Sequence, residues 1–336
     1  MSLPKRTLGK NGPEVSTLGF GLMVGLLSSP TLSYYGPAME DKDAFALLDR
    51  TIELGCTFWD TSDVYGGSED TLGRYFKARP GRRENIFLAT KFGITYENGN
   101  FGSRGDHEYV IAAANKSLER LGVDYIDLFY VHRLDSKVPI EVTMKALVQL
   151  KNKGKIRHIG LSEASSDTLR PAHQVEYSPF ELTIEHNTLA ILKTTRELGI
   201  AIVAYSPLGR GLLTGKFRSP DDFAADDFRR TIPRFAPVNF YKNLEVVDKF
   251  AEIAKARNAT PGQLALAWLL AQGPDIIPIP GTTRHANLEE NIGAVAITLN
   301  ASELAELNGV VRDADVAGER YGSDMLSLTF GDTPAV

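Results

Sequence analysis

The strongest constraint on the fold is an alternation of short apolar runs with longer amphipathic segments along most of the chain. Eight runs rich in β-branched and aromatic residues predict buried strands at residues 17–21, 56–60, 86–91, 125–132, 156–162, 174–177, 200–206 and 276–280. Runs that are apolar on both faces, such as residues 200–204, are typical of parallel sheets covered by helices. Eight strand–helix units in succession predict an α/β fold, a (β/α)8 TIM barrel.

Helix signals fall between these runs. The amphipathic segments are residues 42–54, 68–76, 106–121, 140–153, 165–169, 186–198, 244–257, 258–272, 284–294 and 301–311. Asp106 and Gly122 have the residue types of an N-cap and a C-cap, and Thr260 followed by Pro261 is typical of a helix start. An Asn-Gly pair within residues 7–15 predicts an N-terminal β-hairpin.

The fifth βα unit is expected to be short. Only residues 163–173 separate two predicted strands, and Pro171 interrupts the helical pattern between them. This unit therefore has either a turn or two of helix at most or an altered local topology.

Composition excludes several classes of protein. The 336 residues carry 37 Lys and Arg against 42 Asp and Glu, a net charge of −5, which argues against a general nucleic-acid or membrane-surface binder. Cys56 is the single cysteine, so no internal disulfide is possible, and a reducing, cytoplasmic location is expected. No secretory signal, membrane span or linker is evident, so we expect one domain covering residues 1–336. The sequence does not determine the oligomeric state.

Polar residues end three of the predicted strands. Asp60, Lys91 and His132 occupy the carboxyl ends where barrels place catalytic groups, and Tyr65 follows in the loop after Asp60. Singly, each has a plain structural explanation: a turn cap, a surface lysine, a hydrogen-bonded buried histidine and a packed aromatic ring. Their joint placement at one rim favours a site.

These four residue types suit the reduction of a carbonyl group. A tyrosine, with a reference pKa of about 10, is a weak acid catalyst unless a neighbouring ammonium stabilises its phenolate. A carboxylate could hold that ammonium, and an imidazole could orient the carbonyl oxygen. Because no side chain supplies hydride, the arrangement implies a nicotinamide cofactor. Tyr34, Tyr35 and Phe92 follow two of the strands and are candidates for the pocket mouth.

The segments around these residues resemble the aldo-keto reductase superfamily. They are WDTSDVYGGSED with Asp60 and Tyr65, LATKFG with Lys91, and LFYVHR with His132. The segments GLSEAS, QVEYSPF, AYSPLGRGLLTGKF and IPIPGTTRHANLEENIGA resemble it in the same order, from about residue 7 to residue 311. The pattern is most similar to the YakC-like, pyridoxal reductase-like group.

This resemblance implies NADPH-dependent reduction of aldehydes or ketones to alcohols. Tyr65 would be the general acid, Lys91 and Asp60 would tune it, and His132 would orient the small-molecule carbonyl substrate. The residues implied to bind the nicotinamide end and the pyrophosphate are Ser162, Gln174, Tyr205, Ser206, Pro207, Leu208, Gly209, Gly211, Leu212 and Lys216.

The other end of NADP(H) falls on the segment before the last predicted barrel helix. The residues implied there are Gly281, Thr282, Thr283, Arg284, Asn287, Glu290 and Asn291. The amino end of a helix favours phosphate binding, and Arg284 could pair with a 2′-phosphate, which favours NADPH over NADH.

Two departures from the family pattern concern the cofactor. Glu163 stands where the family often has Asn, and family members carry a longer segment between GLSEAS and QVEYSPF. Both changes flank Ser162 and Gln174, so we expect them to affect cofactor affinity more than any other property.

Other functions fit less of the pattern. An NADPH-binding regulatory subunit with slow turnover, resembling channel β-subunits, would retain the same four residues. A lysine Schiff-base lyase using Lys91 would leave Tyr65 unexplained. The six histidines show no paired ligand spacing, so no metal site is expected, and neither a Rossmann glycine motif nor an esterase elbow is present.

Overall fold

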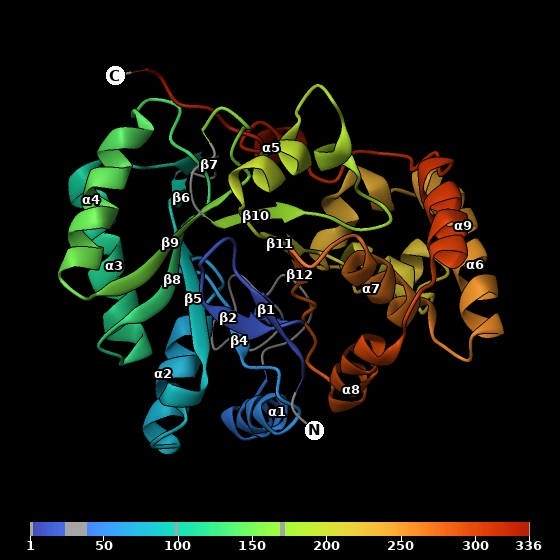
Figure 1. Ribbon diagram of the computed structural model, residues 1–336, viewed down its shortest axis with the longest axis horizontal. Helices are drawn as coiled ribbons and strands as arrows, with labels where there is room; N and C mark the ends of the chain where they lie inside the picture. Colours follow the sequence, from blue (N-terminus) through green and yellow to red (C-terminus); the bar gives the residue numbers. More distant parts are fainter. Residues whose placement is uncertain (1–2, 24–38, 98–99, 169–171, 336) are drawn as a thin grey trace.

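Eight parallel strands form one curved sheet whose spatial order follows the chain order (Figure 1). The computed structural model describes residues 3–23, 39–97, 100–168 and 172–335. The strands are β3 (Phe20–Gly21), β4 (Phe58–Asp60), β5 (Phe87–Phe92), β8 (Ile126–Val131), β9 (Ile156–Ser162), β10 (Ala172–Glu176), β11 (Ile202–Tyr205) and β12 (Ile276–Pro278). Every neighbouring pair is parallel. The predicted (β/α)8 barrel class is confirmed.

Two backbone hydrogen bonds join the first and last strands. The amides of Gly19 and Gly21 donate to the carbonyls of Pro278 and Pro280, at 2.9 and 3.2 Å. In a full parallel ladder the amide of residue 280 would bond to Gly19 in return, but proline has no N–H. These two bonds are therefore both donated by the first strand. The strands also approach closely at Gly21, where a Cβ would lie 2.6 Å from the carbonyl oxygen of Ile279.

Helices surround the barrel. They are α1 (Asp41–Glu53), α2 (Ser68–Ala78), α3 (His107–Leu121), α4 (Ile140–Asn152), α5 (Ile191–Leu198), α6 (Pro237–Ala256), α7 (Pro261–Ala271), α8 (His285–Gly293), α9 (Ala301–Arg312) and α10 (Ser323–Leu326). The expected caps are present: the Asp106 carboxylate accepts from the amide of Tyr109, and Gly122 ends α3 in the left-handed region. Thr260 and Gln263 form a capping box at the start of α7.

Several element boundaries differ from the sequence prediction, most of all two helix starts, and one hairpin was not predicted. Helix α6 begins seven residues before residue 244, because Pro237 occupies its first position. Helix α5 begins five residues after residue 186, because Ala190 takes a left-handed conformation. An antiparallel hairpin of β6 (Ile94–Glu97) and β7 (Asn100–Ser103), which no sequence pattern indicated, follows β5.

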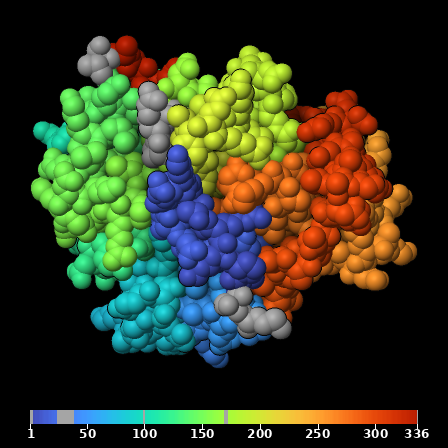
Figure 2. Space-filling view, in the orientation of Figure 1, coloured from blue at the N-terminus to red at the C-terminus, as the bar shows by residue number. Residues whose placement is uncertain are grey.

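The predicted N-terminal hairpin closes one end of the barrel. Strands β1 (Lys5–Thr7) and β2 (Glu14–Ser16) pair around a turn in which Asn11 has a φ of 63°. Leu8 and Val15 pack into the core inside the barrel, beside Phe58 and Leu128. Figure 2 shows this blue segment at the centre of its face, between the green and orange halves of the chain. The opposite end of the barrel is left for the site.

The fifth unit is short, as predicted, but its residues 165–168 form a turn rather than a helix. The amide of Thr168 donates to the carbonyl of Ser165, and Leu169 and Pro171 lie outside the described residues. The C-terminal segment supplies the remaining contacts here. The amide of Ser165 donates to Gly331, and the amide of Gly331 donates to Glu163, both at 2.9 Å.

None of the helices in the described ranges is long and apolar enough to cross a membrane.

Candidate active site

Lys91 is the centre of the predicted catalytic group. Its Nζ donates to Asp60 Oδ1 at 2.5 Å, to the Thr61 carbonyl oxygen at 2.7 Å and to the Tyr65 hydroxyl oxygen at 3.3 Å. Asp60 ends β4 and Lys91 lies near the end of the neighbouring β5, so parallel pairing brings them to the same edge. The structure therefore assembles carboxylate, ammonium and phenol in one chain of contacts.

Asp60 and Lys91 form a buried ion pair, with side chains 3% and 1% exposed. Burial raises the pKa of the Asp60 carboxyl, and Lys91 opposes this rise. Burial lowers the pKa of the Lys91 ammonium, and Asp60 opposes this fall. The carboxylate thus keeps a positive charge beside the Tyr65 hydroxyl, where it stabilises a phenolate relative to a phenol.

His132 directly follows β8 and faces Tyr65. The two rings meet edge to face, with centroids 5.6 Å apart. Burial, together with the nearby cations Arg133 and Lys91, holds the pKa of the His132 imidazole well below its ordinary value, so the ring is neutral at pH 7. The Ser62 hydroxyl lies 3.0 Å from His132 Nδ1. Ser62 was not among the predicted site residues, although it follows β4 by only two positions.

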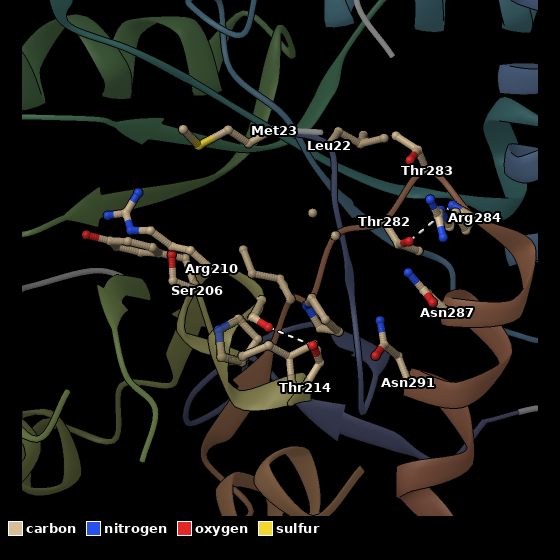
Figure 3. Close-up of a pocket in the computed structure, with 18 of the residues that line it drawn as sticks. Leu22, Met23, Ser206, Arg210, Thr214, Thr282, Thr283, Arg284, Asn287 and Asn291 are labelled. Atoms are coloured by element: carbon tan, nitrogen blue, oxygen red, sulfur yellow. Dashed lines mark hydrogen bonds between the residues drawn. The ribbon is translucent and has the colours of Figure 1, made fainter. Parts of the chain in front are cut away.

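A cavity of 460 Å³ opens beside these residues at the same end of the barrel (Figure 3). Asp60 and Tyr65 are in its wall. The predicted cofactor residues that line it are Tyr205, Ser206, Pro207, Leu208, Gly211, Lys216, Gly281, Thr282, Thr283, Arg284, Asn287, Glu290 and Asn291. Two other predicted residues, Gly209 and Leu212, are buried and do not line it.

One end of this cavity is formed by the amino end of α8. Figure 3 shows Thr282, Thr283 and Arg284 together with Asn287 and Asn291 around this end, while Ser206 and Arg210 lie on the other side. Thr282 Oγ1 accepts from the amide of Arg284 at 3.1 Å, which shapes the turn into the helix. Polar side chains and a helix amino end are suited to anionic phosphate groups.

The loop after β11 forms the opposite wall. The 3-10 segment η3 (Gly209–Thr214) contains three consecutive left-handed residues, Gly209, Arg210 and Gly211. A Cβ at residue 209 would lie 2.9 Å from the Phe180 ring, so glycine permits this close turn.

Lys216 joins this loop to α8. Its Nζ donates to Asn287 Oδ1 at 2.9 Å and to Glu290 Oε2 at 3.3 Å. The lysine was expected to add charge to the pyrophosphate site; in the structure its charge is paired with Glu290.

A second cavity, of 60 Å³, adjoins the first. Tyr65, Tyr205 and Arg210 line both. The predicted residues His132, Ser162 and Gln174 line the second alone, and Gln174 Nε2 donates to Asp60 Oδ2 at 2.8 Å. Met23 and Ser206 also line both cavities. The other residues that line the second cavity are Val64, Ile94, Phe101, Arg133, Phe228, Tyr321 and Met325.

Glu163 does not line either cavity; its carboxylate is bound by Arg320 of the C-terminal segment. Arg320 Nη2 donates to Glu163 Oε2 at 2.7 Å, and the Tyr205 hydroxyl donates to Oε1 at 2.8 Å. Burial acts to raise the pKa of Glu163, but the Arg320 guanidinium outweighs it and brings the pKa to about 2. No sequence pattern predicted the contact between Arg320 and Glu163, because the two residues are 157 positions apart in the chain.

Of the three candidates for the pocket mouth, the structure tests Phe92 and does not support it. Phe92 is fully buried and stacks on Phe129, with centroids 4.7 Å apart, and it lines neither cavity. Tyr34 and Tyr35 lie outside the described residues.

Comparisons with known proteins agree with this fold. The model of the Aldo/keto reductase family matches residues 18–312. The chain is 50% identical to aldo-keto reductase str7 of Strobilurus tenacellus, over 95% of each chain. It is 49% identical to aldo-keto reductase yakc [NADP(+)] of Schizosaccharomyces pombe, over 99% of each chain.

A solved structure matches over 92% of this chain and 100% of its own, with a TM-score of 0.71 and 27% identity. It is a thermostable aldo-keto reductase in complex with the inhibitor epalrestat. The chain belongs to the aldo/keto reductase family, and it is an oxidoreductase of the YakC-like group.

Proposed function

We propose that the protein reduces aldehydes or ketones to alcohols with NADPH, and that Tyr65 donates the proton. The observation that carries this proposal is the position of Tyr65. Its hydroxyl accepts from Lys91 Nζ at 3.3 Å, and the residue lines both cavities, so a dinucleotide in the larger cavity and a carbonyl compound in the smaller one would meet there.

The larger cavity fits a phosphate-bearing dinucleotide. The amino end of α8 with Thr282 and Thr283 would hold phosphate oxygens, and Arg284 would pair with a 2′-phosphate. Tyr205 would contact the nicotinamide end, beside Ser162 and Gln174. The S. pombe relative is named as an NADP(+) enzyme, which supports this choice of cofactor. When bound, the reduced nicotinamide supplies a hydride.

The remaining chemistry belongs to the side chains. The Tyr65 hydroxyl donates its proton to the carbonyl oxygen of the substrate, and the Lys91 ammonium stabilises the phenolate that forms. Asp60 holds Lys91 in place. Neutral His132 donates a second hydrogen bond to the same oxygen from Nε2–H, which requires Nδ1 to accept from the Ser62 hydroxyl.

Tyr65→Phe tests this assignment, because it removes one hydroxyl and keeps the ring. We expect NADPH oxidation that depends on an aldehyde to fall by about 10²–10⁴-fold. NADPH binding, followed by fluorescence titration, should change little. Tyr241→Phe, at an exposed tyrosine of α6, is the matched control and should keep the full rate. A Tyr65→Phe enzyme with the wild-type rate would contradict the proposal.

The regulatory-subunit alternative predicts the same binding with very slow turnover. Multiple-turnover kinetics with a panel of aldehydes, including pyridoxal and aromatic aldehydes, separates the two. We also propose that residues 1–336 act as one domain in the cytoplasm, since one barrel contains every site residue and Cys56 is buried and unpaired.

A further inference from the structure

Arg133 is a buried cation beside the catalytic residues. It directly follows His132, and only 2% of it is exposed. Its Nη1 donates to the His132 carbonyl oxygen at 2.7 Å and to Ser162 Oγ at 3.3 Å. Its buried Nε has no hydrogen-bond partner among the described residues, and no ion pair of Arg133 is found there.

The carboxylates near Arg133 are bound by other arginines. Arg320 is 2.7 Å from Glu163 and 3.2 Å from Glu176, and Arg210 is 3.6 Å from Glu176. Three buried guanidinium groups therefore face two carboxylates, and Asp60 is paired with Lys91. The chain segments outside the described ranges contain no Asp or Glu. Glu163 also attracts Arg133 electrostatically, but it forms its ion pair with Arg320. The three guanidinium groups therefore share two negative charges, and no carboxylate among the described residues is bound to Arg133.

An unpaired charge is expensive to bury, so a buried cation beside a cavity indicates a ligand that supplies the counter-charge. Arg133 lines the smaller cavity together with Tyr65 and His132, and it does not line the larger one. The 2′-phosphate is expected at Arg284 and the pyrophosphate at the loop of residues 206–216, both along the larger cavity. Because Arg133 does not line that cavity, the cofactor phosphates are not the anion in question.

We propose that Arg133 binds an anionic group of the substrate, so that the enzyme prefers compact carbonyl compounds carrying a carboxylate. This inference rests on the proposed reductase function and names its substrate class. The apolar side chains of Val64, Ile94, Phe101 and Phe228 around the same cavity suit an aromatic or aliphatic body for this substrate. A guanidinium binds a carboxylate through charge-assisted, often bidentate, hydrogen bonds.

The test compares substrates that differ only in charge. The 2-, 3- and 4-carboxybenzaldehydes are each paired with their methyl esters, and kcat/KM is measured with saturating NADPH at pH 7. We expect the wild type to favour the acid of at least one pair by tenfold or more. Arg133→Gln should bring that acid-to-ester ratio close to one. Arg157→Gln, at a half-exposed arginine of β9, should leave it unchanged.

Equal kcat/KM for acid and ester in the wild type, or an unchanged ratio in Arg133→Gln, would overturn the inference. A binding readout separates it from the failure of the reductase proposal. Benzoate should raise the Tm of the NADPH-loaded wild type more than benzamide does, and Arg133→Gln should lose this difference.

If no aldehyde is reduced, the reductase proposal fails, and the benzoate shift alone decides whether Arg133 binds an anion. If Arg133→Gln does not fold, Arg133→Lys replaces it. The lysine keeps the charge but not the planar fork, so a reduced acid preference supports the inference. No benzoate shift and no acid preference in the wild type would refute it.

Discussion

At the residue scale, Ser62 Oγ and His132 Nδ1 lie 3.0 Å apart, and the direction of the hydrogen bond between them follows the imidazole tautomer. A neutral imidazole carries one N–H, on either Nδ1 or Nε2. If Ser62 donates to Nδ1, then Nε2–H is available to a substrate oxygen. The ring can orient the substrate only in this state.

We therefore expect Ser62→Ala to lower kcat by about tenfold, the order of one hydrogen bond in a low-dielectric site. Ser62→Thr keeps the hydroxyl and should recover most of the rate. Steady-state kinetics with one neutral aldehyde measures both. A Ser62→Ala enzyme as fast as the wild type would show that Ser62 does not set the histidine proton.

A site residue can be predicted from the sequence when its neighbours along the chain show that it belongs to the site. Asp60, Lys91 and His132 could be predicted because each lies at or next to a strand end, a position readable from the sequence. Arg133 directly follows His132, but no sequence pattern marked it as a site residue. What marks it is that it forms no ion pair with a described carboxylate, and this can be seen only in the folded structure. Arg320 lies outside every predicted strand and helix, and its partners Glu163 and Glu176 are 157 and 144 residues away.

At the scale of elements, the C-terminal segment is attached to the barrel through the shortened fifth unit. Backbone bonds join Gly331 to Glu163 and Ser165, and the buried Arg320–Glu163 pair adds the charged contact. Tyr321 and Met325 of the same segment line the smaller cavity. The described part of the short fifth unit is therefore a contact for the C-terminal segment, which also lines the smaller cavity.

Glu163→Gln should destabilise the protein by about 3–5 kcal/mol, because it leaves Arg320 buried with a weaker partner. Folding lowers the pKa of Glu163 from 4.5 to about 2. Its ionised carboxylate therefore adds to the free energy of unfolding above about pH 4.5, and this stabilisation is lost as the pH falls towards 2. Urea unfolding of both proteins at pH 7 and pH 3 measures this. The difference between them should be smaller at pH 3, and an equal difference at both values would contradict the assignment.

At the scale of the whole molecule, the alternation of strands and helices was sufficient to predict the barrel, and the Asn-Gly pair was sufficient to predict the N-terminal hairpin but not its place at one end of the barrel. It could not place the β6–β7 hairpin, because residues 94–103 carry no strong strand pattern before the chain is folded. Nor could it show that residues 165–168 are a turn bonded to Gly331, since that partner comes from the other end of the chain. The pattern of strands and helices does not predict contacts between segments that are far apart in the sequence.

The barrel also explains why one end carries all the chemistry. The N-terminal hairpin fills the opposite end with Leu8 and Val15, and in the described part of the chain Tyr65 lines the two adjoining cavities. The central claim is that these cavities hold the cofactor and the carbonyl compound on either side of that hydroxyl.

A crystal structure of the protein with NADP(+) tests this claim most directly. We expect the nicotinamide ring at the junction of the cavities, against Tyr205 and next to the Tyr65 hydroxyl, with the 2′-phosphate at Arg284. A nicotinamide ring bound away from Tyr65, or a dinucleotide outside the larger cavity, would contradict the account.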